Sequence, residues 1–363
     1  MLRAPAEMGP WVAALEALAD GAAEPNVFHE HWFMRAAWET LGDATVSLVL
    51  VQAAGASGPS HPLWAAFPVD VIRAHPAIPA PAVRIWEHRY AFLSTPLVRP
   101  GYAHAALKAL CDWIRAEVGP RAALRLDTIS GGGAIHGAVE ALSQPRWLAG
   151  GYSRPMYRRA PVPVEPGLGR LVSRGRRHEL RRQRRRLGER GELTVTHLSA
   201  ACDAAAFAEE FLALEASGWK GRSGTAMASD PASARFFRTV AVAAHARGRL
   251  RGTSMRLDGR AIAQSVDFLT RDGGFAFKTA YDEAWRKYST GVLLEVEGLL
   301  DMQARPEIAW MDSCATPDHP MIGQLWAGRR PIAHMLVGTG APASNWLVSS
   351  MPALRWVKHR LRR

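Results

Sequence analysis

The segment of residues 274–295 constrains the fold most, because a strand pattern passes there into a helix pattern through a short loop. Residues 275–281 (FAFKTAY) have a strand pattern, and residues 290–303 have the apolar spacing of a helix. A strand that feeds a helix through a short loop directs several backbone N–H groups at one point, and the helix dipole makes that point attractive to anions. The sequence therefore predicts an anion site at the start of this helix.

The residues at this join suit a phosphate group. Ser289 and Thr290 can cap the helix, and Gly291 lets a phosphate approach the backbone closely. Arg286 and Lys287 add positive charge just outside. Many helices begin in a similar way, so this start alone does not identify a cofactor site.

The chain has 363 residues, more than one compact core usually spans, which predicts two domains. We expect a mixed α/β domain over residues 1–155, with a Pro-rich break at 75–81 between two strands. Residues 156–169 are predicted as a linker, and 170–340 as a second domain that becomes a sheet from residue 250. Residues 341–363 are predicted to hold a last strand, at 345–348, and a basic amphipathic tail.

The formal net charge of +12 is concentrated in two segments. Residues 170–190 carry ten Arg against Glu179 and Glu189, and residues 351–363 carry five basic residues and no acidic one. Within the first segment, Leu180 and Leu187 form a thin apolar stripe on a basic helix. Both segments lie outside 274–295 in the sequence, so the charge indicates where the protein works more than what it catalyses.

Three explanations of the two basic segments stay open. The first is a solvated helix face, and the second is RNA bound by Arg174–Arg190 through its phosphates. The third is an anionic membrane surface. In the tail, Leu354, Val357 and Leu361 share one face with Trp356 beside them, and basic residues fill the other face, which is typical of an interfacial helix.

Several classes of protein are disfavoured by the sequence. No apolar run is long enough to cross a bilayer, and the N-terminus lacks the order of a signal peptide. Cys111, Cys202 and Cys314 are odd in number and far apart, which argues against a disulfide framework or a metal knuckle. We therefore expect a cytoplasmic protein that binds no metal. If the basic segments bind an anionic membrane, the protein would also attach peripherally to the inner face of the membrane.

Three blocks carry a family resemblance. They are residues 211–226 (FLALEASGWKGRSGTA), 277–294 (FKTAYDEAWRKYSTGVLL) and 312–326 (DSCATPDHPMIGQLW). In this order they resemble the CelD/BcsL-type acetyltransferases of the GNAT superfamily, which are related to the FemAB-like proteins. The resemblance covers roughly residues 165–335, and more loosely the first half through residues 87–97. It implies an α/β (α+β) fold with two GNAT-like mixed-sheet domains flanked by helices, in the FemAB-like arrangement.

The resemblance also implies an activity and a donor site. The activity is acyl-CoA-dependent N-acyltransfer, in which an acetyl or longer acyl group passes from CoA directly to an amine. The main chain near Thr279–Tyr281 would polarise the thioester, and Tyr281 or Tyr288 would protonate the thiolate. One departure is visible, because residues 286–291 (RKYSTG) retain only the last glycine of the usual loop. The residues expected to bind acyl-CoA are Lys278, Thr279, Ala280, Lys287, Tyr288, Ser289, Thr290 and Gly291.

The general base is left open among four residues that border the expected cleft. They are Glu215, Asp282, Asp312 and His319, of which only His319 has an ordinary pKa near neutrality. Simpler interpretations stay beside these: Glu215 as an ion pair with Lys220, Asp312 as the end of a strand, and His319 as part of a turn. Trp219 and Lys220 are predicted to contact the acceptor.

Two alternatives to this activity remain. One is transfer of a long acyl chain to a membrane lipid amine, such as a sphingoid base. The other is a FemAB-like transferase that uses aminoacyl-tRNA, or a non-catalytic protein that binds RNA or membranes.

Overall fold

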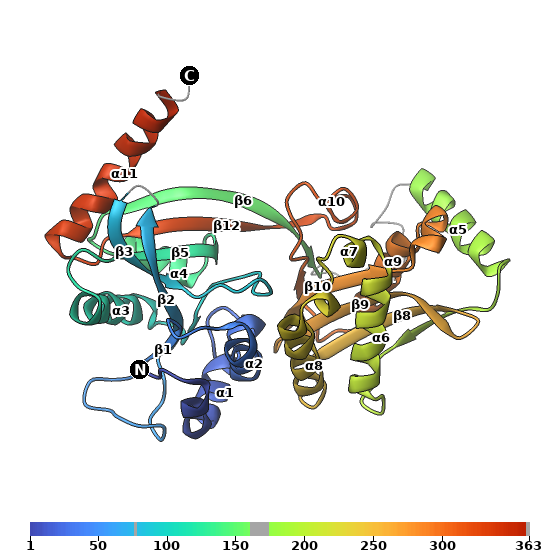
Figure 1. Cartoon of the computed structure of the whole chain (residues 1–363), viewed down its shortest axis with the longest axis horizontal. Helices are drawn as coiled ribbons and strands as arrows, with labels where there is room; N and C mark the ends of the chain where they lie inside the picture. Colours follow the sequence, from blue (N-terminus) through green and yellow to red (C-terminus); the bar gives the residue numbers. More distant parts are fainter. Residues whose placement is uncertain (76–77, 160–173, 361–363) are drawn as a thin grey trace. The chain divides into compact units, whose positions relative to one another are not determined.

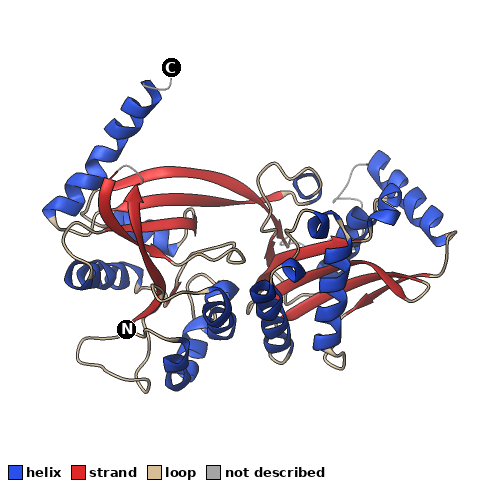
Figure 2. Ribbon diagram, viewed as in Figure 1, coloured by secondary structure: helices blue, strands red, loops and turns tan. Residues whose placement is uncertain are grey.

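The computed structural model describes residues 1–75, 78–159 and 174–360 (Figures 1 and 2). The chain divides into two compact units. The first unit comprises Met1–Ser153 and Pro331–Arg363, and the second comprises Arg154–Arg330. Each unit combines a mixed β-sheet with helices, which confirms the expected α/β class.

The sheet of the first unit has the order β1-β2-β3-β5-β12, in which β3 and β5 are parallel and the other neighbours antiparallel. Its strands are β1 (Ser47–Val51), β2 (Ala65–His75), β3 (Ile78–Ile85), β4 (Leu97–Val98), β5 (Ala123–Ser130) and most of β12 (Gly328–Val337). The short strand β4 pairs with β2. Its helices are η1 (Pro5–Trp11), α1 (Val12–Asp20), η2 (Val27–His29), α2 (His31–Leu41), α3 (Ala103–Glu117), α4 (Ala134–Ala141) and α11 (Pro342–Arg360).

Both faces of this sheet are covered because its strands alternate apolar residues toward either side. Val83 and Leu124 lie in the cluster that packs against α3 and α4, whereas Ala82 and Ala123 lie in the cluster under α11. On α3 the buried residues recur at helical spacing, which is why this segment forms an amphipathic helix.

The sheet of the second unit has the order β6-β11-β10-β9-β8-β7, in which only β10 and β11 are parallel. Its strands are the end of β6 (Arg146–Arg158), β7 (Leu193–His197), β8 (Leu250–Leu257), β9 (Arg260–Leu269), β10 (Gly273–Tyr281) and β11 (Trp310–Asp312). Its helices are α5 (Arg174–Gly188), α6 (Ala204–Ser217), α7 (Trp219–Arg222), η3 (Met227–Ser229), α8 (Pro231–His245), η4 (Glu283–Tyr288), α9 (Thr290–Ala304) and α10 (Ile322–Leu325).

Each unit contains a strand from the other half of the chain. β6 follows the elements of the first unit, and its residues 156–158 pair with β11 in the second. β12 follows the elements of the second unit, and its residues 332–337 pair with β5 in the first. Folding of either sheet therefore requires both halves of the chain.

Four expectations about local structure and domain bounds are wrong. Residues 156–158 lie in β6 and not in a linker, because pairing with β11 decides their conformation; residues 160–169 lie outside the described chain. Residues 78–81 belong to β3, since the pairing with β2 continues across Pro81 beside a register shift. Residues 345–348 lie in α11 and not in a strand, and residues 331–337 lie in the first unit and not in the C-terminal domain.

Most other elements of the second unit are confirmed. Helices α6 and α9 and the hairpin of β8 and β9 form where their apolar patterns predict them. The hairpin turns at Asp258 and Gly259, both with positive φ, as an Asp-Gly turn requires. Leu180 and Leu187, which the sequence placed on one stripe, are the buried residues of α5.

Two buried imidazoles make the stability of the first unit depend on pH. Burial lowers the pKa of His29 to about 3, and burial also lowers the pKa of His88 to about 3. In the unfolded chain each imidazole has its ordinary pKa of about 6.5. The folded state therefore binds fewer protons, and its stability is complete above pH 6.5 and declines as the pH falls toward 3.

We expect the replacement His29→Phe to reduce this pH dependence. At pH 5.5, one unit below the unfolded pKa, each histidine costs the folded state about 1.4 kcal/mol. The loss in unfolding free energy between pH 7.5 and pH 5.5 should thus be about 1.4 kcal/mol smaller in the variant, measured by urea denaturation. His104→Phe, at an exposed position on α3 of the same unit, is the control. Equal losses in wild type and His29→Phe would contradict the assignment.

Candidate functional site

Strand β10 loses its neighbour β11 partway along its length. The two strands pair only through Gly273–Phe275 and Trp310–Asp312, where β11 ends. On its other side β10 stays paired with β9 as far as Tyr281. The side of residues 276–281 that faces away from β9, hereafter the open edge of β10, therefore has no strand partner in the described chain.

Two backbone donors point toward the open edge. The Asp282 N–H donates to the Ile262 carbonyl of β9, and in an antiparallel pair alternate residues turn their N–H groups to opposite sides. The N–H groups of Thr279 and Tyr281 consequently point away from β9. Lys220 Nζ donates to the Thr279 carbonyl at 3.1 Å from the same side. The expected carbonyl donor at Thr279–Tyr281 thus lies on an edge that a substrate can approach.

Asp312 determines where β11 stops. Its side chain is fully buried, with one oxygen accepting the Cys314 N–H at 2.9 Å. The other oxygen accepts from Arg154 at 3.3 Å and from Arg330 at 2.9 Å. Cys314 has a left-handed φ of 53°, which turns the chain away from β10. Because both carboxylate oxygens are engaged, the geometry of Asp312 is that of a structural residue and not of an accessible base.

The adjacent thiol is not activated. Burial raises the pKa of Cys314 well above its ordinary value, and the Asp312 carboxylate adds to the rise. A protonated thiol is a poor nucleophile, so the geometry gives no support to covalent transfer through this residue.

The first unit repeats this fork of strands but fills it with its own chain. β3 and β5 pair in parallel through residues 82–84 and 123–125, and β3 then ends. Residues 93–95 occupy the position beside the end of β5. The Ser94 N–H donates to the Thr128 carbonyl, and the Ser130 N–H donates to Thr95 Oγ1. Asn26 Nδ2 donates to the carbonyls of Leu93 and Thr95. The second unit alone therefore offers an open strand edge of this kind in the described chain.

The start of α9 has several polar groups available to an anion. Thr290 is 1% exposed, and its Oγ1 has no partner in the described chain. The Ser289 carbonyl accepts from Val292 and Leu293, and no described backbone group accepts from the N–H groups of Thr290 and Gly291. Two N–H groups and a buried hydroxyl fit phosphate oxygens at the positive end of a 15-residue helix.

Ser289 does not cap α9 with its side chain, so that expectation is wrong. It has a left-handed φ of 55°, which reverses the chain between η4 and α9. Gly291 lies against the Tyr281 ring. A Cβ at this position would be 3.4 Å from the ring, which is an ordinary van der Waals contact, so the ring packs on the first turn of α9 without requiring a glycine there.

The two candidate tyrosines differ in their surroundings. Tyr288 is buried, and its hydroxyl accepts from Arg190 Nε at 3.0 Å. Lys287 lies over the Tyr288 ring, with Nζ 5.2 Å from the centroid. Tyr281, at the end of the open edge, is half-buried. Position therefore favours Tyr281 as the proton donor, and Tyr288 as a support for the loop.

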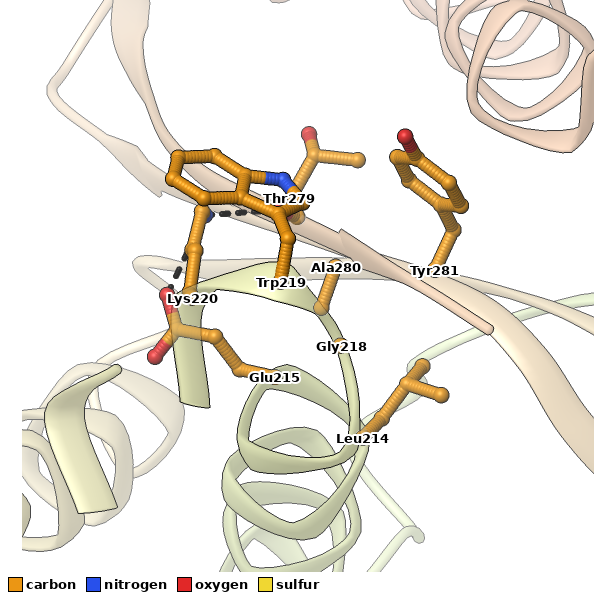
Figure 3. Close-up of a pocket in the computed structure, with 8 residues that line it drawn as sticks. All are labelled: Leu214, Glu215, Gly218, Trp219, Lys220, Thr279, Ala280 and Tyr281. Carbon is orange, nitrogen blue, oxygen red and sulfur yellow. Dashed lines mark hydrogen bonds and ion pairs between the residues drawn. The ribbon is translucent and has the colours of Figure 1, made fainter. Parts of the chain in front are cut away.

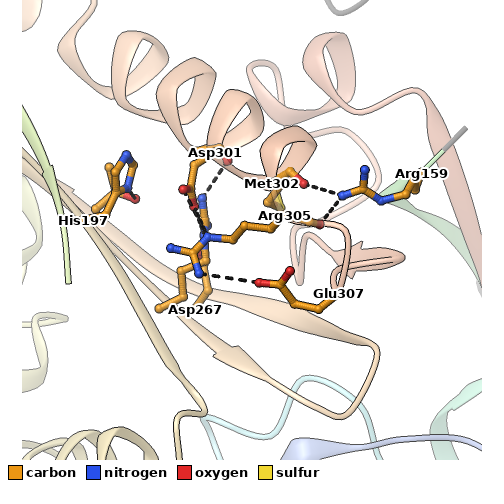
Figure 4. A network of polar contacts seen from close by, with 10 residues as sticks. Arg159, His197, Asp267, Asp301, Met302, Arg305 and Glu307 are labelled. Carbon is orange, nitrogen blue, oxygen red and sulfur yellow. Dashed lines mark hydrogen bonds and ion pairs between the residues drawn. The ribbon is translucent and has the colours of Figure 1, made fainter. Parts of the chain in front are cut away.

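Buried ion pairs hold α9 against the sheet. Arg251 of β8 pairs with Asp267 and with Asp301 of α9, and it donates to the Gly298 carbonyl at 2.6 Å. In the same C-terminal part of the helix, Arg159 donates to the carbonyls that end it, including that of Met302 at 2.8 Å (Figure 4). These contacts fix the position of α9, and with it the position of its N-terminus.

A shared ion cluster forms the wall beside the open edge (Figure 3). Glu215 Oε1 accepts from Lys278 Nζ at 3.0 Å and from Lys220 Nζ at 3.2 Å, and Oε2 accepts the Met227 N–H at 2.8 Å. Burial would raise the pKa of Glu215, but Lys278, the Met227 N–H and Lys220 together lower it. The sequence placed Glu215 and Lys220 in an ion pair, and the structure adds Lys278 to it.

The cluster carries one positive charge in excess, because two ammonium groups share one carboxylate. Burial lowers the pKa of Lys278 and Lys220 lowers it further, whereas Glu215 raises it. The cluster thus favours an anionic group nearby, and its carboxylate is not available as a base.

Trp219 lies above this cluster. Its indole is 51% exposed and lines a pocket with Lys220, Thr279 and Tyr281. In Figure 3 the side chains of Trp219 and Tyr281 flank Thr279. The pocket volume of about 20 Å³ is close to the space of one water, so this pocket is a niche in the wall of a site and not a complete substrate cavity.

The other two candidate bases are engaged in local contacts. Asp282 accepts the Ala284 N–H at 2.9 Å and pairs with Arg260 at 3.3 Å. His319 Nδ1 accepts the Ile322 N–H at 3.2 Å, so a neutral His319 carries its proton on Nε2. In that tautomer Nε2 donates and cannot accept a proton, which leaves His319 better suited to donate a hydrogen bond.

One carboxyl of interest lies within a helix and outside any motif, so no sequence pattern signals it. Burial raises the pKa of Glu295 on α9 to about 7, and Asp267 adds to the rise, although Trp326 Nε1 donates to Glu295 at 2.6 Å. A pKa near neutrality is suited to proton transfer.

The basic helix α5 lies beside the anion site, although the sequence separates the two. Arg190, just after α5, contacts Tyr288 of η4, and Arg184 pairs with Glu297 of α9. The expectation that the excess positive charge lies away from the site is therefore wrong for α5. Tertiary contacts bring these segments together, and no local pattern signals them.

Residues 174–319 match a family model described as an acetyltransferase (GNAT) domain. The match begins at the first residue of α5 and ends at His319, so it includes the open edge and the start of α9. Over these residues the second unit is therefore similar to GNAT-type acetyltransferase domains. The narrower CelD/BcsL-type resemblance stays a prediction. No curated protein matches the chain significantly.

Solved structures with the same fold cover nearly the whole chain. FemX covers 90% of this chain and 95% of its own length, with a TM-score of 0.56 and 11% identity. The C-terminal domain of a putative lysylphosphatidylglycerol synthetase from Agrobacterium fabrum covers 96% of both chains, with a TM-score of 0.57 and 11% identity. A conserved protein of unknown function from Bacteroides thetaiotaomicron covers 90% and 97%, with a TM-score of 0.55 and 11% identity. These similarities confirm the two-domain mixed-sheet fold and show nothing of substrates.

We expect Glu215→Gln to destabilise the protein, because two partly buried ammonium groups would lose their counter-charge. The expected loss is about 3 kcal/mol in unfolding free energy, measured by urea denaturation. Glu209→Gln, on the same helix in an exposed pair with Arg238, should change it by less than about 0.5 kcal/mol. If Glu215→Gln kept its stability but lost transferase activity, Glu215 would be a base and not a structural counter-ion.

Proposed function

We propose that the second unit is an acyl-CoA-dependent N-acyltransferase that moves an acyl group from CoA directly to an amine. The observation that carries the proposal is the open edge of β10 next to the start of α9. This combination offers backbone donors for a thioester and an anion site for phosphates on adjacent residues.

Donor binding follows from these two features. The N–H groups of Thr290 and Gly291, with Thr290 Oγ1, suit a pyrophosphate, and Lys287 adds charge outside. The amides of the CoA arm would pair with the open edge, as an added strand pairs with a sheet edge. This pairing would bring the thioester carbonyl to the N–H group of Thr279 or of Tyr281.

The chemistry requires no covalent enzyme intermediate. The amine nitrogen attacks the thioester carbon, and one of the two N–H groups stabilises the negative charge that develops on the oxygen, while the other pairs with the CoA arm. The C–S bond then breaks, Tyr281 gives its proton to the thiolate, and the amine proton passes to water, from which Tyr281 regains a proton. Since Glu215, Asp282, Asp312 and His319 are all engaged, we propose that the amine arrives neutral or loses its proton to water.

The acceptor would lie against Trp219. Its exposed indole offers an apolar surface beside the thioester position, and Lys220 and Lys278 supply positive charge below it. This wall suits an amine that carries an apolar group, including a lipid amine such as a sphingoid base.

A second candidate donor is an aminoacyl-RNA, which the position of α5 favours. Residues 174–190 carry nine Arg and two Glu, and Arg184 and Arg190 contact the elements at the anion site. Arginine binds phosphates in a bidentate way, so this surface suits more phosphates than CoA contains. Transfer from aminoacyl-RNA, with none from acyl-CoA, would select this donor.

We expect Tyr281→Phe to lower kcat roughly 100-fold with little change in KM, because the variant keeps the ring but lacks the proton for the thiolate. Release of CoA thiol, followed with a thiol reagent over a panel of acyl-CoA chain lengths and amines, measures both constants. Tyr102→Phe, exposed in the first unit, is the matched control. An unchanged kcat in Tyr281→Phe would remove Tyr281 from the reaction.

We expect one acyl-CoA to bind per chain, because residues 93–95 fill the fork of the first unit. Titration calorimetry should give a stoichiometry of one, and Gly291→Glu should weaken binding at least 100-fold by placing a carboxylate at the anion site. Gly137→Glu, on α4 with open space around it, is the control. Two sites per chain, or equal binding by Gly291→Glu, would contradict the proposed donor site.

A further inference from the structure

Lys220 on α7 has one hydrogen-bond donor without a partner in the described chain. A lysine ammonium carries three N–H donors. Lys220 Nζ donates to Glu215 Oε1 at 3.2 Å and to the Thr279 carbonyl at 3.1 Å (Figure 3). The Lys220 side chain is 23% exposed, so the third N–H is open to a ligand.

The charge around this donor is not balanced by the protein. Glu215 is the one carboxylate that Lys220 and Lys278 share, and it is fully buried, with its second oxygen on the Met227 N–H. The acidic residues that follow β10 do not offset the remaining charge, because they have arginine partners of their own: Asp282 pairs with Arg260, and Glu283 with Arg222. A group that binds at the free donor therefore gains by being negatively charged.

The donor lies beside the backbone group that would hold the thioester. In an antiparallel strand the N–H and the carbonyl of one residue point to the same side. Lys220 contacts the Thr279 carbonyl, so its ammonium and the Thr279 N–H lie on the same side of β10. Covalent geometry places these two backbone atoms about 3 Å apart. An acid oxygen on Lys220 and a thioester oxygen on the Thr279 N–H would thus be separated by roughly 5 Å.

The niche beside Lys220 has the shape for one acid oxygen. It is lined by Trp219, Lys220, Thr279 and Tyr281, among others, and it has room for a group the size of one water. The exposed indole of Trp219 stands over it, which leaves an apolar surface for the rest of the same molecule.

We infer that the acceptor amine carries an acid group one or two carbons from its nitrogen, and that Lys220 binds this acid group. A longer spacer would not fit the roughly 5 Å between the two groups. An amine without an acid group is a cation in water and would meet an excess of positive charge here, whereas an amine with one acid group is neutral overall. This role of Lys220 rests on the proposed acyl transfer and narrows its acceptors, since a sphingoid base has no acid group.

Thiol release by the full-length protein with paired acceptors tests this role. Phenylalanine should react with a kcat/KM at least tenfold above that of phenethylamine, which has the same ring and a similarly basic amine but no acid group. The phosphonate analogue of phenylalanine distinguishes a phosphate-type acid from a carboxylate, and a preference for either acid over phenethylamine supports the role. Because 6-aminohexanoate has a long spacer, it should react no better than phenethylamine.

Lys220→Met should reduce the preference for the acidic acceptor about tenfold, because a charge-assisted hydrogen bond is lost. Lys220→Arg, which keeps the charge, should retain most of the preference. Arg222→Met, on the same helix but in an exposed pair with Glu283, is the matched control. The ratio of the two acceptors is the measured quantity, since a general loss of structure would lower both rates alike, and thermal unfolding should show that each variant is folded.

Two results would overturn the role of Lys220. One is a wild-type protein that uses phenethylamine or sphingosine at least as well as phenylalanine, and the other is an unchanged ratio in Lys220→Met. Thiol release with no amine at all would instead contradict the proposed acyl transfer. Calorimetry would then decide about Lys220 separately: phenylalanine should bind Lys220→Met about tenfold more weakly than wild type, and equal binding would contradict the acid site.

Discussion

The buried carboxylate of Asp312 is the interaction on which the site of the second unit depends. One of its oxygens binds the backbone two residues ahead and turns the chain, and the other holds Arg154 and Arg330. β11 therefore ends directly after its three pairs with β10, and β10 continues without a neighbour. A buried ion cluster of this kind stabilises one arrangement of the strands when all its partners are present, and removal of one partner leaves an uncompensated charge. The open edge is thus a consequence of how the carboxylate is paired.

The two units show what this open edge requires. Both contain a parallel pair of three residues on each strand, and in both a non-glycine residue with left-handed φ follows the pair, Thr128 in the first and Cys314 in the second. They differ in what lies beyond. In the first unit Asn26 holds residues 93–95 against the end of β5, so the backbone groups there are already paired. In the second unit the space beside β10 is bordered by the Glu215 cluster and by Trp219. The same arrangement of parallel strands is therefore filled by the chain itself in the first unit and left open as a candidate donor site in the second unit.

The sequence predicted well what depends on local pattern. The strand, loop and helix over residues 274–295 and the helix α6 follow from apolar spacing, and the order of three motifs was sufficient to indicate the acetyltransferase domain that the family match now supports. Features that depend on distant contacts were not predictable. Asp312 looked like a candidate base because its two arginine partners lie far away in the sequence. The sequence did not distinguish Tyr288 from Tyr281 as the proton donor, whereas the structure shows Tyr288 buried and Tyr281 half-buried. Likewise, α5 lies beside the anion site only through single contacts to Tyr288 and Glu297. Residues 345–348 looked like a strand because three apolar residues after Asn345 show no helical period of their own; the period appears only with Ser344 and Met351.

Hydrogen–deuterium exchange with a non-hydrolysable thioether analogue of acyl-CoA tests the central claim most directly, because it reports on backbone N–H groups. If the open edge of β10 and the start of α9 bind the donor, the analogue should slow exchange in peptides that cover residues 276–293. Peptides that cover the equivalent fork of the first unit, residues 82–95, should be unchanged. Protection of the first-unit fork, or no protection in residues 276–293 at saturating analogue, would contradict the account.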